Sequence, residues 1–184
     1  MKTYAKCPAE VVERATSIIK KYHPDLHAVG IKIDFISVST DEEGATALAL
    51  HGYPCAAVVK IIGPKERAVG RGDAEIVIDE EGWLNMDDAK KDALLDHELY
   101  HLDVQRNKHG KPKLDCSRRP KLQMKLHDRQ YGWFDEIAQR HGSASLECQQ
   151  AMGLYLAGKQ TYFQFALNMG AESDGVKATV KLMA

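Results

Sequence analysis

The chain has 184 residues, of which 44 % are hydrophobic, a length and composition that fit one packed domain with room for a small appendage. Its 25 basic and 26 acidic residues give a formal net charge of -1, which excludes a chain-wide attraction to nucleic acid or to an anionic membrane. No apolar run reaches the roughly 18 residues of a membrane span, no signal peptide is recognisable at the start, and the four scattered cysteines predict reduced thiols in a cytoplasmic protein.

The first half of the chain predicts one helix followed by strands. Apolar residues at three- and four-residue spacing predict a helix over residues 8–22. Residues 45–55 are ambiguous, residues 65–73 are expected to be a polar loop, and residues 80–82 are expected to form a closing turn. Runs rich in β-branched residues predict three strands, over residues 31–40, 56–62 and 74–79.

A long helix is expected in the middle of the chain. Asp87 or Asp88 is suited to cap its start, and the apolar periodicity predicts that it runs to about Arg106. Apolar residues then alternate with polar ones over residues 122–126, which predicts a strand.

The segment between them, residues 106–125, holds eight basic residues, one acidic residue and no aromatic residue. We interpret it as a solvated connecting loop, because stacking on bases is unsupported without aromatic side chains. Arg118 and Arg119 remain candidates to meet a substrate carboxylate or a phosphate.

Two further helices and a strand are predicted towards the end. Asp128 is expected to cap a helix that ends at His141, and residues 145–157 predict a second helix. Alternating apolar residues over residues 176–182 predict a late, half-exposed strand.

This order of elements predicts an α+β fold with one small mixed or antiparallel sheet that packs on the central helix. We assign residues 1–145 to that domain. Residues 146–184 are expected to form a helix and strand extension that packs on the same domain.

The central helix contains the pattern His-Glu-x-x-His at residues 97–101. The two histidines are four residues apart, so both imidazoles lie on one helix face, where their nitrogens can bind one metal ion. Glu98 points about 100° away and is placed to take a proton from a metal-bound water rather than to bind the metal. The alternative is two surface histidines beside a solvated glutamate, which the capped helix and the preceding strand disfavour. The motif therefore predicts a zinc site with His97 and His101 as ligands and Glu98 as general base.

A catalytic zinc needs a third protein ligand and an open position. A longer pattern with glycine at 104 and histidine at 107 is excluded, because the chain has Val104 and Asn107. We choose His127, which lies where the 122–126 strand meets the next helix, and keep Asp128 as the second choice. The remaining downstream candidates are Glu136, His141 and His109.

Several stretches extend the motif, namely residues 72–79, 93–102, 119–122, 127–128 and 133–142. Together they resemble the putative phage metallopeptidase family over roughly residues 10–145, and the pairing of the helix motif with the later His-Asp is the most discriminating element. The resemblance implies a zincin-like fold, related in outline to the SprT-like zincins, and a phage or prophage origin. The cysteine-rich ribbon that follows many SprT-like domains is missing here, which weakens any carry-over of their association with DNA.

These observations predict a zincin-like peptidase that uses Zn²⁺ and acts on a peptide or protein substrate. Tyr131 is a candidate oxyanion donor, with a buried aromatic role as the alternative. Two other functions stay open. One is a phage protein whose zinc is structural and which binds a host partner, and the other is a DNA-associated protease that uses the basic segment 106–125.

Overall fold

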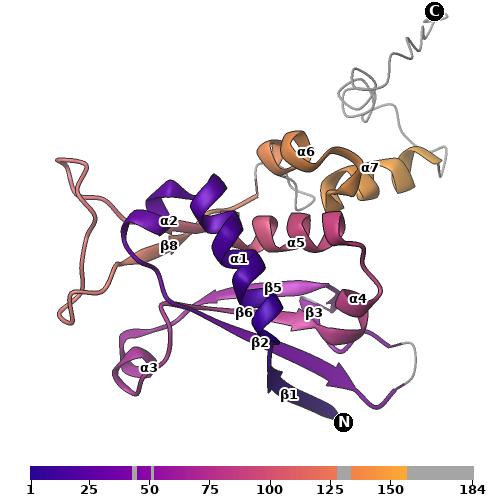
Figure 1. The fold of residues 1–184 in the computed structure, drawn as a ribbon, viewed down its shortest axis with the longest axis horizontal. Coiled ribbons are helices and arrows are strands. Elements are labelled where there is room, and N and C mark those ends of the chain that lie inside the picture. Colours follow the sequence, from indigo (N-terminus) through magenta and orange to yellow (C-terminus); the bar gives the residue numbers. More distant parts are fainter. Residues whose placement is uncertain (43–44, 51, 128–133, 157–184) are drawn as a thin grey trace, which may run out of the picture. The chain divides into compact units, whose positions relative to one another are not determined.

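The computed structural model describes residues 1–42, 45–50, 52–127 and 134–156, and the chain divides into two compact units, Met1–Leu126 and His127–Ala184 (Figure 1). None of the helices in these described stretches has the length and apolar sequence that a membrane span requires. The four cysteines form no disulfide bond in the described residues.

A four-stranded mixed sheet forms the base of the first unit, with strand order β1-β2-β6-β5. Its central strands β2 and β6 are parallel, whereas β1 and β5 each pair antiparallel with their neighbour. The predicted small sheet is therefore confirmed, but β1 was not predicted, because all of its residues are exposed and carry no apolar alternation. The four strands are β1 (Lys2–Lys6), β2 (Ile33–Thr40), β5 (Ala57–Ile61) and β6 (Ala74–Asp79).

Two helices cover this sheet in the first unit, α1 (Ala9–Tyr22) and α5 (Asp88–Tyr100), which contact each other (Figure 1). A short helix, α2 (Pro24–Ala28), follows α1. Helix α5 also contacts β5, so the predicted packing of the central helix on the sheet is confirmed. The core between them is apolar, with fully buried side chains from β6 and α5 that include Ile76, Ile78, Leu94, Leu95 and Leu99.

Two segments expected to be irregular are helical instead. The predicted polar loop contains α3 (Pro64–Ala68), which begins with Pro64 at its first turn and is closed by the Glu66 carboxylate accepting the Gly63 N–H at 3.2 Å. The expected closing turn is α4 (Glu80–Leu84), where Asp79 accepts the Gly82 N–H at 2.9 Å. Both predictions were wrong because Gly, Pro and Asp serve here as helix starts rather than as turn residues.

The predicted extension of the central helix to Arg106 is also wrong. Helix α5 ends at Tyr100 and is followed directly by β7 (Leu102–Val104), which pairs antiparallel with β8 (Leu122–Met124). Leu102 and Val104 are buried on one face of β7, a period of two that a helix cannot provide. The predicted strand over 122–126 is confirmed in its first three residues.

The ambiguous region 45–55 forms a two-stranded ribbon of β3 (Ala49–Leu50) and β4 (Tyr53–Pro54). Its entry is fixed to the sheet by the buried carboxylate of Asp79, which accepts the Ala47 N–H at 2.7 Å. The same carboxylate caps α4, so one side chain holds both connections at the end of β6.

The second unit contains α6 (Asp135–His141), a short 3-10 turn (Gly142–Ala144) and α7 (Leu146–Leu156). Helix α6 ends as predicted, with Gly142 at a φ of 52° that favours glycine. It begins at Asp135, so the expectation that Asp128 caps it is wrong. Asp128 itself, Tyr131, the predicted last helical residue Ala157 and the predicted strand 176–182 lie outside the described residues.

Candidate metal centre

Helix α5 places two imidazoles next to each other at its C-terminal end. The helix starts where the Asp87 carboxylate accepts the Lys90 N–H at 2.8 Å, and the motif forms the last turn of its 13 residues and the C-cap, His101. The rings of His97 and His101 are 5.2 Å apart between centroids and inclined by 77°. His97 is buried, while His101 is half-buried at the helix end. The predicted pairing of the two rings on one helix face is thus present.

A backbone carbonyl fixes the orientation of the His101 ring. The ring Nδ1 lies 2.8 Å from the Lys125 carbonyl oxygen, which can only accept a hydrogen bond, so Nδ1 carries the proton. The lone pair is then on Nε2, the nitrogen left for a metal. The Lys125 N–H in turn donates to the His101 carbonyl at 2.7 Å. These two bonds hold the chain at residue 125 against the end of α5.

This pairing of residues 101 and 125 explains how a third histidine reaches the motif. It continues the register of the β7–β8 ribbon, in which Leu102 is opposite Met124. His127 follows two residues later and is exposed. Each of the three histidines offers one ring nitrogen, and these nitrogens lie within 4.8 Å of one another. In the described part of the chain, His97, His101 and His127 form the group of His, Cys, Asp or Glu side chains that can hold a metal ion.

Glu98 is buried beside the histidine pair and exerts its charge on a nearby thiol. Burial raises the pKa of the Cys55 thiol, and the negative charges of Glu98 and Asp79 raise it further.

A buried hydrogen bond between a carboxylate and an imidazole lies directly beside the motif, and the sequence did not single it out. Asp96 is fully buried, and one of its oxygens lies 2.6 Å from Nε2 of His23, at the end of α1. The contact joins the turn of α5 that carries His97 to the C-terminal end of α1. No local spacing reveals it, because the partners are 73 residues apart in the sequence.

The other candidate ligands have different surroundings. Glu136 forms an ion pair with Arg140 on the exposed side of α6. His141 is the last residue of α6, the position where a histidine faces the negative end of a helix dipole. His109 is exposed in a turn where its N–H donates to the Asn107 side chain at 2.9 Å. Asp128, the second choice for the third ligand, and Tyr131 are outside the described residues.

The residues at this place fit a divalent transition metal. Three neutral imidazoles are common ligands for such ions, and the proton on Nδ1 of His101 leaves the opposite nitrogen available. Three protein ligands also leave one coordination position for another molecule, as a catalytic site requires. This histidine triad can therefore bind a metal ion.

Comparison with known protein families gives a match to this chain. The model of the putative phage metallopeptidase family matches residues 2–155, which include the whole motif and the later histidine. This confirms the family resemblance noted in the sequence. No curated protein and no solved structure matches the chain.

Proposed function

The chain belongs to the putative phage metallopeptidase family, and on that premise we propose that it hydrolyses peptide bonds at a zinc ion bound by His97, His101 and His127. The observation that carries the proposal is the grouping of three imidazole nitrogens within 4.8 Å of one another. Glu98, which follows His97 on α5, is buried. We further propose that the mixed sheet and α5 form a zincin-like domain over residues 1–145, in a protein of phage or prophage origin.

Zinc is the proposed ion because its four-coordinate geometry suits three imidazoles and one exchangeable position. Bound there, it would act as a Lewis acid towards a water molecule and a peptide carbonyl. His101 contributes a ring whose tautomer is already set by the Lys125 carbonyl, so its ordering cost is met before binding. His127 is exposed, so the proposed third ligand is accessible from solvent.

Glu98 is the proposed general base. It lies one residue after His97 on α5, so its side chain is rotated about 100° from that ligand around the helix axis and can accept a proton from the attacking water. The water oxygen then bonds to the peptide carbon, the C–N bond breaks, and the same carboxyl group returns the proton to the leaving amine. Its buried position limits competing bulk water around the transferred proton.

The test is the paired measurement of zinc content and peptidase activity for the wild type, Glu98→Gln and the control Glu13→Gln. Glu13 is an exposed residue of α1, so Glu13→Gln removes one negative charge, as Glu98→Gln does, and leaves the motif unchanged. We expect all three proteins to bind about one zinc ion. Glu98→Gln should lose at least about 100-fold in kcat, a typical contribution of a general base, while the control stays at wild-type activity.

Two outcomes would contradict the proposal. If wild type binds no zinc after reconstitution, the metal centre is wrong. If zinc binds and neither wild type nor control cleaves a broad peptide library, the alternative of a zinc-stabilised phage protein that binds a host partner replaces the peptidase.

A further inference from the structure

The chain between β7 and β8 is a folded projection of the first unit, here called the basic arm and defined as residues 105–121 (Figure 1). Three points of its base are joined by backbone hydrogen bonds of 2.7–2.9 Å. Two tight turns extend from that base. The two sides of each turn are paired by one antiparallel β-bridge, and one side chain in each turn accepts two backbone N–H groups. The base residues are Gln105, Lys113 and Lys121, and the accepting side chains are Asn107 and Asp115.

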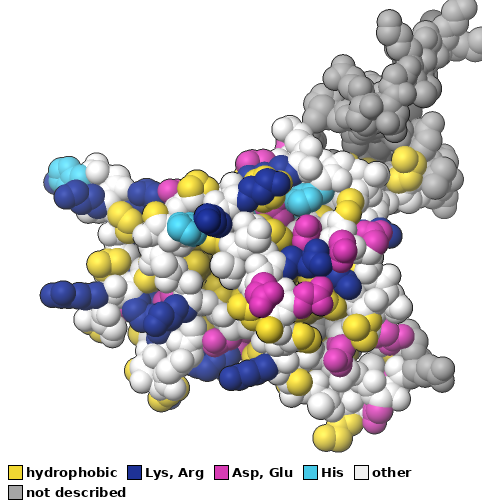
Figure 2. Space-filling model, in the orientation of Figure 1, with side chains coloured by type: hydrophobic (Ala, Val, Ile, Leu, Met, Phe, Trp, Pro, Cys, Tyr) yellow, Lys and Arg dark blue, Asp and Glu magenta, His cyan; other side chains and the backbone are white. Residues whose placement is uncertain are grey.

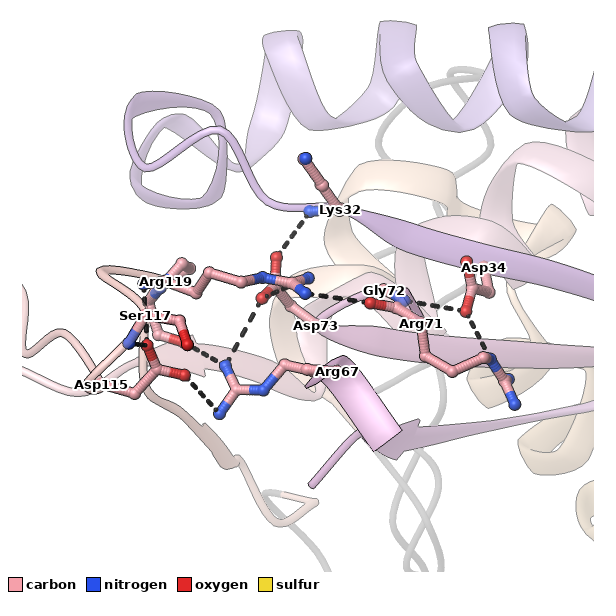
Figure 3. A network of polar contacts seen from close by, with 10 residues as sticks. Lys32, Asp34, Arg67, Arg71, Gly72, Asp73, Asp115, Ser117 and Arg119 are labelled. Carbon is pink, nitrogen blue, oxygen red and sulfur yellow. Dashed lines mark hydrogen bonds and ion pairs between the residues drawn. The ribbon is translucent and has the colours of Figure 1, made fainter. Parts of the chain in front are cut away.

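A buried network fixes this arm to the sheet (Figure 3). Asp73, the residue before β6, is fully buried and lies 2.8 Å from Nη2 of Arg119 and 3.5 Å from Nη1 of Arg67. The other terminal nitrogen of Arg67, Nη2, lies 3.1 Å from the Asp115 carboxylate. The Lys32 N–H also donates to Asp73, at 2.9 Å. Two aspartates and two arginines thus neutralise each other inside the base of the arm.

This pairing removes the single acidic residue of the arm from its outer surface. Asp115 has only 7 % of its side chain exposed, and it is the only Asp or Glu within residues 105–121. Figure 2 shows Lys and Arg side chains over the projecting segment. Six cationic side chains of the arm are exposed, namely Arg106, Lys108, Lys111, Lys113, Arg118 and Lys121. Within the described residues, Arg106 has an ion-pair partner, Asp25, and the structure gives none for the other five.

The chemistry of this surface points to a phosphate backbone. Protein interfaces depend on aromatic and apolar anchors, whereas the arm has no aromatic residue and a single large exposed apolar one, Leu114. Repeated cations without such anchors bind by releasing counterions from a regularly charged polyanion. The absence of aromatic rings also removes the stacking that favours single strands. We propose that the basic arm binds the phosphate backbone of duplex nucleic acid without reading its sequence.

The rigid base supports this assignment. A loop that merely connected β7 to β8 would need neither 17 residues nor a buried ion-pair network, because the two strands are already adjacent. Fixing the backbone reduces the entropy lost when several lysines contact phosphates together. The segment is the exposed connection that the sequence predicts, and its base is in addition anchored by the buried network.

The experiment measures binding of the full chain to fluorescein-labelled duplex DNA of mixed sequence as a function of salt. The test variant carries Lys108→Gln, Lys111→Gln and Lys113→Gln. The matched control carries Lys2→Gln, Lys6→Gln and Lys20→Gln, three exposed lysines of β1 and α1 with the same total charge change.

We expect wild type and control to bind the duplex alike, with affinity falling steeply as salt is added. The arm variant should bind at least about tenfold more weakly at low salt, and its log–log salt slope should be smaller by up to about 3, one counterion for each lost contact. The melting temperatures of both variants should equal that of wild type, which would show that a difference in affinity does not come from unfolding.

Four results would contradict the proposal. The first two are failure of wild type to bind duplex at low salt, and binding of the arm variant that equals that of the control. The third is equal binding of poly-glutamate and duplex DNA, which would assign the arm to an acidic protein partner. The fourth is tighter binding of single-stranded DNA than of duplex DNA, which would contradict the assignment of the arm to a duplex.

Discussion

Helix α5 and the basic arm are separated only by β7, yet they use charge in opposite ways. In α5, seven consecutive residues from Ala93 to Leu99 are buried, and polar groups face specific partners or the proposed metal. In the arm, the charges at the base are paired and hidden, while the remaining cations face solvent. The contrast teaches that one short stretch can hold a buried histidine motif beside an exposed cationic surface, because α5 packs on the sheet while buried ion pairs hold the base of the arm.

The largest loss of stability should follow from emptying the core beneath the motif. Leu95 on α5 is fully buried, so Leu95→Ala should lower the free energy of unfolding by about 4 kcal/mol through lost burial and a residual cavity. The matched change in the arm, Leu114→Ala, removes a half-exposed side chain and should cost less than about 0.5 kcal/mol. Urea unfolding followed by circular dichroism measures both, and equal losses would erase the contrast between the two regions.

A somewhat smaller loss should follow from breaking the anchor of the arm. Asp73→Asn removes the buried charge that neutralises Arg67 and Arg119, and we expect a loss of about 3 kcal/mol. The value lies at the low end of such changes, because Arg67 keeps Asp115 and Arg119 is 22 % exposed. Hydrogen exchange should increase in residues 105–121 more than in α5. Exchange that rises first in α5 would show that the network does not hold the arm.

The smallest effect concerns acid stability. The pKa of Asp115 lies below its ordinary value, chiefly because the Arg119 N–H donates to the carboxylate, with burial opposing the shift and the Ser117 N–H and the Arg67 charge supporting it. A lowered pKa in the folded state stabilises the fold fully above the unfolded-state value of about 3.9, and this stabilisation disappears as pH falls through the folded-state pKa. The stability difference between wild type and Asp115→Asn should therefore shrink between about pH 5 and pH 2. A difference that stays constant with pH would contradict this role.

The parts of the fold that were predictable depend on short spacings. The Asp87 cap, the four-residue spacing of His97 and His101, and the β-branched run of β6 each carry their signal within a few residues. The end of α5 was missed because Leu102 continues the helical spacing of Leu95 and Leu99, and the partner strand of β7 lies 18–22 residues further along the chain.

Contacts over long separations were not predictable at all. Arg67, Asp73 and Arg119 span 52 residues, and nothing near any one of them indicates the others. The sequence suggested His127 as third ligand from its position after a strand, but only the pairing of residues 101 and 125 explains how it approaches the motif.

The central claim is a metal held by three imidazoles, and X-ray absorption of the zinc-loaded protein tests it most directly. The account predicts a first shell of nitrogen and oxygen at about 2.0–2.1 Å, with multiple-scattering features of three imidazoles that fall to two in His127→Ala. A sulfur shell at about 2.3 Å, or an unchanged histidine count in that variant, would contradict it.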